Sequence, residues 1–397
     1  MADKEKKSVN MGFILVSTSH ALNHVYDTLL PVLYPTIISE FNLSYSLVGL
    51  LVMGYRLSSG ALQITMGFLG RFVRRKILLG VGMIWQTLMN VSISVSNGFE
   101  NVFVSRTLAG VGSSPQHPTG AAYIAENFSK KQIGRAMGLN LTAAQAGRFL
   151  APFMGTLLLP ILGWRTTILV FSVPGLVVGI AFLFIKESKR SSNSGGQSSL
   201  AVLSKGLREV FRNRTVLMIM VLETVMAFRA GAADFIPSFL VRGIGMSSLE
   251  AGVLFTIFLG SGLPAPFFWG YLSDRFERRK ILMLVMGMAC ILWYLLPYGR
   301  NNIQFLMILI PLGFVCHGVG GLIQAYVAVA TTRENRDLVY GIYFTLAYTL
   351  GSFSPVIQGS LADSFGFQAS FWYVALISIF AVIVSYFLKA REAPTTS

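Results

Sequence analysis

The sequence predicts an all-α integral membrane protein with twelve transmembrane helices in two pseudo-symmetric six-helix bundles. Three observations predict this class: the composition, the placement of basic residues between spans, and an internal repeat. Of 397 residues, 53% are hydrophobic and only 12% are charged, about half the charged share of a typical soluble domain. The mean hydropathy is +0.62. A soluble chain could not bury so much apolar surface, so the composition excludes an ordinary soluble enzyme, a disordered chain and a small secreted scaffold.

Apolar stretches bounded by charged or turn residues predict the individual spans. A helix needs about 20 predominantly apolar residues to cross a bilayer, and stretches longer than that predict tilted or kinked helices. The twelve predicted spans are residues 11–38, 45–69, 77–96, 102–124, 134–159, 166–185, 215–241, 248–271, 280–298, 302–330, 338–360 and 368–388.

The basic residues predict the orientation. With the N-terminus inside, 25 of the 32 Lys and Arg residues fall in inner loops and termini, and three fall in outer loops. Because cytoplasmic loops are enriched in Lys and Arg, we expect a multi-pass plasma-membrane protein with both termini cytoplasmic. The charged N-terminus has no small-residue cleavage site after it, so we expect a retained first helix. The net charge of +15 then reflects the inner loops, and no nucleic-acid partner is expected.

A long central segment and a repeat divide the chain. Residues 186–214 begin with a polar stretch and continue with basic and apolar residues near helical spacing, which predicts an amphipathic interfacial helix; a solvated linker is the alternative. The segment separates predicted bundles at 1–185 and 215–397. The sequence GFLGRFVRRKIL, from residue 67, returns as GYLSDRFERRKIL 203 residues later. Such duplication is typical of transporters.

The two repeated segments resemble the cytoplasmic loop motif of the major facilitator superfamily, Gly-x-x-x-Asp-Arg-x-Gly-Arg-Lys or Arg-Lys-Arg. The second copy has the acid of the motif, with Glu277 in place of the usual glycine, whereas the first copy has Gly70 where the acid stands. The resemblance implies a central cavity, alternating access, and neither enzymatic activity nor a cofactor. It also implies an inner gate, weaker in the first half, formed by Arg71, Arg75, Asp274, Arg278 and Arg279.

Two further motifs lie within predicted spans. The fourth span resembles the Arg-x-x-x-Gly-x-Gly motif of the superfamily, and the fifth resembles a degraded form of the motif of proton-antiporting exporters. These resemblances imply helix packing at Gly110, Gly112, Gly147, Pro152 and Gly155. The stretches HALNHVYDTLLPVLYP and GSSPQHPTGAA resemble fosmidomycin-resistance-type exporters. Together these resemblances imply export of a small organic compound, such as an antibiotic or an organic anion, by proton antiport.

Ionisable residues inside spans mark the expected transport pathway. Each charge costs roughly 2.5–3.5 kcal/mol at the helix centre, so such residues mark cavities by default. The first, fourth, seventh and tenth spans hold all four histidines and the deep acids, and these spans line the cavity in the resembled family. His20, His24 and Asp27 share one helix face by their spacing. Glu223 and Asp234 are eleven residues apart, which predicts a shared face in the seventh span.

We expect the following roles. No match to the GxxxxGK[ST] motif occurs, so an ion gradient must supply the energy. Proton coupling is assigned to Asp27 with His24 as its neighbour, and to Glu223 and Asp234 in reserve, because carboxylates and imidazoles exchange protons. The excess of arginine over acid in the spans favours an anionic or zwitterionic substrate; Arg56 and Arg148 are equally explained as structural partners between helices. Substrate binding is assigned to His20, Asn23, Arg106, His117, Arg229, His317 and Gln324.

Other functions remain open. Proton symport of an organic anion is one alternative. A metal-ion carrier or metalloenzyme is another, because His20 and His24 have the spacing of a zincin helix and Asp27 could be a third ligand. Ala21 stands where a zincin has its catalytic glutamate, which argues against hydrolysis, and no metal is assigned. A receptor or scaffold is disfavoured by short loops. The expected partners are a small-molecule substrate, protons and membrane lipids, with the chain as a monomer.

Overall fold

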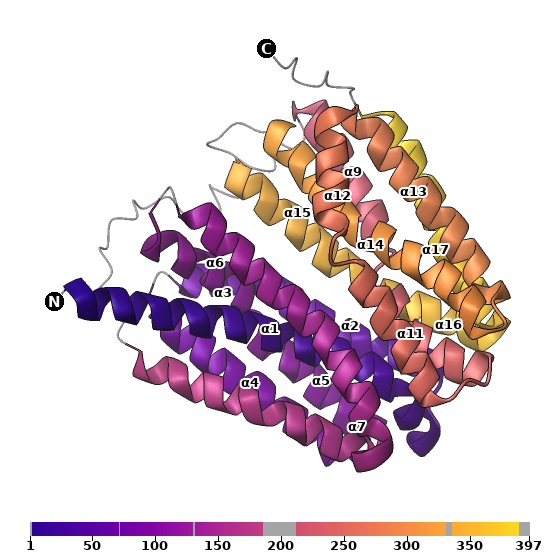
Figure 1. The fold of residues 1–397 in the computed structure, drawn as a ribbon, viewed down its shortest axis with the longest axis horizontal. Helices are drawn as coiled ribbons and strands as arrows, with labels where there is room; N and C mark the ends of the chain where they lie inside the picture. The colour runs from indigo at the N-terminus through magenta and orange to yellow at the C-terminus, as the bar shows by residue number, and fades with distance from the viewer. Residues whose placement is uncertain (1, 71, 130–131, 186–211, 331–335, 389–397) are drawn as a thin grey trace. The chain divides into compact units, whose positions relative to one another are not determined.

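The computed structural model describes residues 2–70, 72–129, 132–185, 212–330 and 336–388 (Figure 1). All regular elements within these ranges are helical. The predicted amphipathic helix lies almost wholly in residues 186–211, outside the described residues, and so does Arg71 of the predicted gate.

The helices of the first half follow the predicted spans in order. Local sequence explains several of their ends: Ser44 caps α2 by accepting a hydrogen bond from the Leu47 amide at 3.2 Å, as short polar side chains do at helix starts. Gly163 joins the two helices of α7, with a φ of 69° that favours glycine. The elements are α1 (Ala2–Phe41), α2 (Tyr45–Ala61), α3 (Gln63–Leu69), α4 (Arg75–Ser94), α5 (Phe99–Ser113), α6 (Gln116–Asn127) and α7 (Ile133–Phe184).

The second half is likewise a succession of helices, but short irregular helical segments interrupt more of its spans. The side chain of Asn213 caps α9 by accepting from the amides of Thr215 and Val216. The elements are α9 (Arg214–Ala227), η1 (Ala232–Phe235), α10 (Ile236–Ser238), η2 (Phe239–Gly243), α11 (Ser248–Ser261), α12 (Ala265–Arg275), α13 (Arg278–Leu295), η3 (Leu296–Tyr298), α14 (Asn302–Ala330), α15 (Arg336–Gly351), α16 (Ser354–Phe365) and α17 (Phe367–Tyr386).

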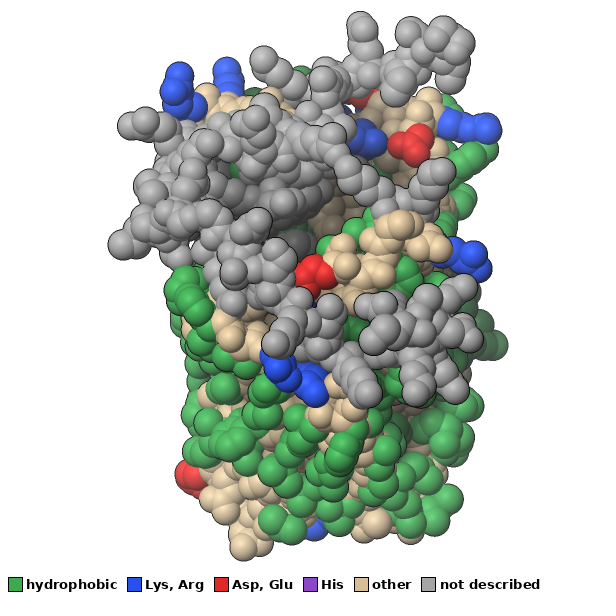
Figure 2. Space-filling view, turned by 90° about the vertical axis from the view of Figure 1, so that its left-hand side faces the viewer, with side chains coloured by type: hydrophobic (Ala, Val, Ile, Leu, Met, Phe, Trp, Pro, Cys, Tyr) green, Lys and Arg blue, Asp and Glu red, His purple; other side chains and the backbone are tan. Residues whose placement is uncertain are grey.

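The surface is that of a membrane protein. Among the described residues, eight helical stretches are long and apolar enough to cross a bilayer, and α7 counts once there although it comprises two helices. Large apolar side chains face outward, including Phe267, 82% exposed, and Phe184, 80% exposed. Figure 2 shows hydrophobic side chains over much of the face that it draws. Outward-facing apolar side chains in such number are stable against lipid and unstable in water.

The described chain packs as two compact units. The first contains residues up to Ser192 together with Ile236–Val253, and the second contains Asn193–Phe235 and the chain from Leu254. Residues 236–253, predicted to belong to the second bundle, therefore group with the first unit. In the first unit, α1, α4 and α7 run side by side, and in the second α13 lies along α17 (Figure 1).

Two glycines show the sequence repeat in the tertiary structure. Gly147 of α7 lies so close to α1 that an added Cβ would overlap the carbonyl oxygen of Ala21. Gly351 of α15, 204 residues later, lies against α9 in the same way, and an added Cβ would be 2.8 Å from the carbonyl oxygen of Ala227. The same small residue thus permits the same close helix approach in each half.

The seventh span is broken, which corrects one prediction. After α9 ends, Gly231 adopts a φ of 82°, and a Cβ there would overlap the ring of Pro355. The carbonyls freed by the break are satisfied by α16: Ser354 donates to the carbonyl of Phe228, and Gln358 donates to that of Ala230 at 2.9 Å. Because α9 and η1 are separate elements, the prediction that Glu223 and Asp234 share one continuous helix face is wrong.

Candidate functional site

Three histidines gather in the first unit. His20 and His24 lie one turn apart on α1, and His117 lies in the first turn of α6. Their ring centroids are 5.1 Å apart for His20 and His24, 5.1 Å for His20 and His117, and 5.8 Å for His24 and His117. His20 is 4% exposed and His24 is 6% exposed. The spacing predicted the pair on α1, and packing of α6 against α1 adds the third ring.

One turn beyond His24 on α1, Asp27 forms an ion pair with Arg106. Nη2 of Arg106, on α5, is 3.4 Å from Oδ1 of Asp27. Arg106 is 2% exposed, and its Nη1 donates to the carbonyl oxygen of Tyr26 at 3.0 Å. The guanidinium also stacks 3.8 Å from the centroid of the Tyr55 ring, a cation–π contact that strengthens where water is excluded. Arg106 is therefore held in place, while the Asp27 side chain keeps 27% of its surface accessible.

Uncharged polar residues connect this pair to neighbouring helices. Asn23 donates from Nδ2 to the hydroxyl of Ser113 at 2.9 Å, and Tyr55 donates to the same hydroxyl at 3.2 Å. Gln86 of α4 donates to the Tyr55 hydroxyl at 3.2 Å. The network joins α1, α2, α4 and α5. Sequence reasoning missed Tyr55, Gln86 and Ser113 because it considered mainly ionisable residues; buried polar side chains in spans are the signal that points to them.

Arg148 of α7 belongs to the same region. It lies within electrostatic range of all three histidines of the cluster, and Asp27 lies within range of His117. Asn140, two turns earlier on α7, is the polar neighbour of His20, and its Oδ1 is buried and makes no hydrogen bond of normal geometry. The first unit therefore brings two guanidinium groups, one carboxylate and three imidazoles into one polar region.

The candidate residues of the second unit have different surroundings. Arg229 contacts sulfur atoms: Nη2 lies 3.2 Å from Sγ of Cys316, and Nη1 lies 3.4 Å from Sδ of Met286. Glu223, 9% exposed, has Tyr343 as a hydrogen-bond partner and Arg229 within electrostatic range.

His317, Gln324 and Asp234 complete the candidates of the second unit. His317 donates from Nδ1 to the carbonyl of Gly313, on its own helix, at 2.8 Å, and its ring packs against Phe258. This arrangement fits a packing role at least as well as a substrate contact. Gln324 is half-buried on α14, and Asp234 is half-buried in η1.

The loop residues form local ion pairs. Asp274 lies 3.3 Å from Arg278, four residues later, and its side chain is 74% exposed. Arg279 instead lies 2.9 Å from Glu277 and donates to the carbonyls of Tyr386 and Leu388 at the end of α17. A hydrogen bond from Lys280, with Arg279 nearby, holds the pKa of Glu277 below its usual value.

In the first half, Arg75, which corresponds to Arg279 in the repeat, pairs with an acid from another helix. Nε of Arg75 donates to Glu126 of α6 at 2.8 Å, and a second contact joins Nη2 to the same carboxylate. Gly70 thus leaves the motif without its own acid, but Arg75 is still paired. Sequence reasoning missed Glu126 because it is 51 residues away in the chain.

The predicted packing residues lie at close helix contacts. A Cβ on Gly110 would overlap the carbonyl oxygen of Tyr55, and one on Gly112 would be 2.6 Å from the amide nitrogen of Gln86. A Cβ on Gly155 would be 2.6 Å from Cδ1 of Leu29. Pro152, next to these contacts on α7, is buried.

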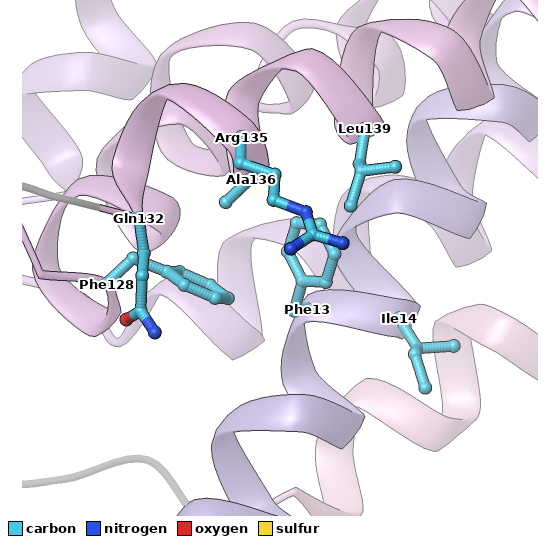
Figure 3. A pocket seen from close by; sticks show the side chains of 7 residues that line it. All are labelled: Phe13, Ile14, Phe128, Gln132, Arg135, Ala136 and Leu139. Carbon is cyan, nitrogen blue, oxygen red and sulfur yellow. The ribbon is translucent and has the colours of Figure 1, made fainter.

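A separate pocket of about 430 Å³ opens near the start of α1 (Figure 3). Its walls are mainly apolar, and Arg135 places a guanidinium over it. It shares no residue with the histidine cluster. The lining residues are Phe13, Ile14, Phe128, Gln132, Arg135, Ala136 and Leu139.

Comparison with known proteins identifies the family. The profile of the Major Facilitator Superfamily matches residues 16–247 and 225–397, which together span nearly all of the chain. The chain belongs to the major facilitator superfamily. It is therefore a secondary transporter of a small molecule and a multi-pass membrane protein, and members of this superfamily are transporters rather than enzymes.

Relatives within the major facilitator superfamily carry varied names. The fosmidomycin resistance protein of Escherichia coli (strain K12) is 20% identical over 98% of this chain and 96% of its own length. The hexuronate transporter of Bacillus subtilis (strain 168) is 22% identical over 96% and 94%. The crystal structure of a bacterial homolog of the human lysosomal transporter Spinster, inward-facing and unoccupied, has a TM-score of 0.82 and 16% identity, with coverage of 98% and 99%.

Proposed function

We propose that this transporter couples the movement of a small organic anion to protons, with Asp27 and Arg106 as the coupling pair. The observation that carries the proposal is the contact of 3.4 Å between an accessible carboxylate and a guanidinium that is 2% exposed. Arg148 adds a second positive charge nearby. A site with this charge attracts an organic acid, and a hexuronate is the named substrate of one full-length relative.

The coupling follows from exchange of partners at Arg106. An incoming substrate carboxylate competes with Asp27 for the guanidinium, and a bidentate carboxylate is a strong ligand for arginine. Once displaced, Asp27 is a carboxylate within a membrane span that has lost its ion-pair partner, and uptake of a proton removes the cost of that charge. Anion and proton therefore bind more tightly together than separately, which is positive linkage and leads to cotransport.

The neighbouring residues take supporting roles in this proposal. His20, Asn23 and His117 supply hydrogen-bond donors and acceptors to the rest of the substrate, and His24, one turn from Asp27, modulates its proton exchange. In the second half, Arg229, His317 and Gln324 remain candidates for substrate contacts, and Glu223 and Asp234 for proton transfer.

The membrane, the oligomeric state and the orientation of the transporter belong to the same proposal. We place the transporter in the plasma membrane as a monomer with both termini in the cytoplasm. In that orientation the pocket under Arg135 would face the inner lipid interface, where an acyl chain and an anionic headgroup match its lining.

Export by proton antiport is a second candidate. It is favoured by the close contact of Gly147 with α1, within a span that resembles the motif of proton-antiporting exporters, and by the name of the fosmidomycin resistance protein. Antiport requires that proton and substrate exclude each other. A substrate with a cationic group that pairs directly with Asp27 would meet that requirement.

Transport assays in proteoliposomes test both candidates. The purified protein is reconstituted, a pH gradient of either sign is imposed, and uptake of labelled hexuronates and other organic acids is measured. Cotransport predicts accumulation when the outside is acidic, whereas antiport predicts accumulation when the inside is acidic. Transport that is unaffected by either gradient would contradict proton coupling in both forms.

A further inference from the structure

The histidine cluster has features that the proposed anion pathway does not require. The chain has four histidines, and three of them converge from α1 and α6. One ring nitrogen from each of His20, His24 and His117 lies within 4.8 Å of the other two. Three ligand atoms at such separations surround a volume suited to a single ion.

The nitrogens of two of these rings are available. Both ring nitrogens of His20 and the Nδ1 of His24 are buried and make no hydrogen bond of normal geometry. Both residues are more than nine-tenths buried. Buried polar atoms in native proteins are nearly always satisfied, so each exception needs an explanation, such as an ion or a water. Oδ1 of Asn140, the polar neighbour of His20, is a further buried polar atom that makes no hydrogen bond of normal geometry.

The donor set selects a borderline transition metal. Neutral imidazole suits zinc, copper, nickel and iron, and three histidines with one open position form a known type of zinc site. At zinc–nitrogen distances of 2.0–2.1 Å, tetrahedral ligands lie about 3.3 Å apart. Contraction by about 1.5 Å or less at the widest pair is therefore needed, which small side-chain rotations supply.

The neighbouring charges act in opposite directions. Arg148, within electrostatic range of all three rings, disfavours a cation, while Asp27, within range of His117, favours one. Asp27 itself is paired with Arg106. The ligand set expected from spacing alone, His20, His24 and Asp27, is thus replaced by one in which His117 is the third ligand.

We infer that His20, His24 and His117 form a binding site for one divalent zinc ion, with Asn140 positioned to supply the fourth ligand or to hold a metal-bound water. The inference shares these three histidines with the proposed anion transport, but its test is separate, because it measures equilibrium metal binding rather than transport.

Direct titration tests the site. The full chain is purified in detergent with an affinity tag that contains no histidine, stripped with a chelator, and titrated with Zn²⁺ alone by calorimetry at neutral pH. One ion per chain should bind. His24→Gln and His117→Gln should each weaken binding by about 100-fold or more, beyond the 10–100-fold typical of outer-shell partners. The matched control is His317→Gln, which removes the fourth histidine and should leave zinc affinity unchanged.

The Arg148→Gln variant tests the inference by the direction in which the affinity for Zn²⁺ changes. Removal of the positive charge should tighten Zn²⁺ binding several-fold if the cluster holds a cation. Weaker Zn²⁺ binding in this variant would overturn the inference, because a cation held by the three rings cannot gain affinity from a positive charge beside it.

If a variant misfolds, metal binding by the wild-type protein still tests the inference. Co²⁺ bound to the wild type should give the intense visible absorption of a four-coordinate nitrogen site, and Zn²⁺ should displace it at one equivalent. Absence of stoichiometric Zn²⁺ binding by the wild type, or equal affinity in correctly folded His24→Gln, would also overturn the inference.

Discussion

The guanidinium of Arg106 lies 3.4 Å from Oδ1 of Asp27 and stacks on the ring of Tyr55. This arrangement joins the first span to the fourth through a charge that is buried and a carboxylate that is partly accessible. Because the two residues differ in exposure, a substrate or a proton can reach Asp27 while Arg106 stays fixed.

Asp27→Asn should reduce pH-gradient-driven transport about 100-fold or more, the lower end of the range for loss of a proton-transfer group. The amide cannot exchange a proton, yet it fits the same space, so folding should be retained. Counterflow, which needs no gradient, should persist. The matched control is Glu100→Gln, an exposed acid in the first turn of α5. Gradient-driven transport at the wild-type rate in Asp27→Asn would move proton coupling to Glu223 or Asp234.

Arg106→Lys should raise the substrate KM about tenfold or more, although the charge is kept. A lysine lacks the planar fork that binds a carboxylate in two places and stacks on an aromatic ring. Initial rates over a range of substrate concentrations measure this effect. An unchanged KM would show that the substrate does not contact Arg106.

Gly147→Ala should destabilise the protein by about 1–3 kcal/mol, the usual cost of overpacking. Its Cβ would overlap the carbonyl oxygen of Ala21, so α1 and α7 must move apart. The control is Gly138→Ala on the same helix, where nothing lies within 4 Å of the new methyl group. Thermal unfolding in detergent should show a lower Tm for the first variant only; equal Tm values would contradict the packing role.

Glu40→Gln should lower the Tm at pH 7 and have little effect near pH 3. Beyond the end of the predicted first span, the Trp164 indole donates to Glu40 at 2.7 Å, and Arg165 lies 2.7 Å away. These contacts, the Trp164 hydrogen bond first, hold the pKa of Glu40 below its usual value. A lowered pKa gives stability that is present above the unfolded-state value and is lost as the pH falls through the folded one. A Tm difference that stays constant between these pH values would be the contrary result.

Asp274→Asn should shift the conformational equilibrium more than Gly70→Ala. Asp274 contributes an ion pair with Arg278, whereas a Cβ on Gly70 meets only ordinary contacts at 3.4 Å or more. Spin-label distances across the inner face, recorded for both variants, measure the shift. Equal shifts would remove the proposed asymmetry between the halves.

Features that depend on local spacing were predictable from the sequence. The helical content and the order of the helices follow from runs of apolar residues, and the shared face of His20 and His24 follows from the 3.6-residue period of a helix. The cost of burying charge singled out Asp27 and Arg106 as candidates. The 204-residue separation of Gly147 and Gly351 indicated the repeat that both residues show in their helix contacts.

Features that depend on contacts between distant segments were decided only by the tertiary structure. His117 completes the histidine cluster because α6 packs against α1, and Glu126 pairs with Arg75 across 51 residues of chain. The break at Gly231 depends on the ring of Pro355 and on two donors from α16. Helix periodicity determines which residues share a face, but the partner of that face depends on how separate helices pack. That packing is set by side-chain shape and close backbone approach over long sequence separations.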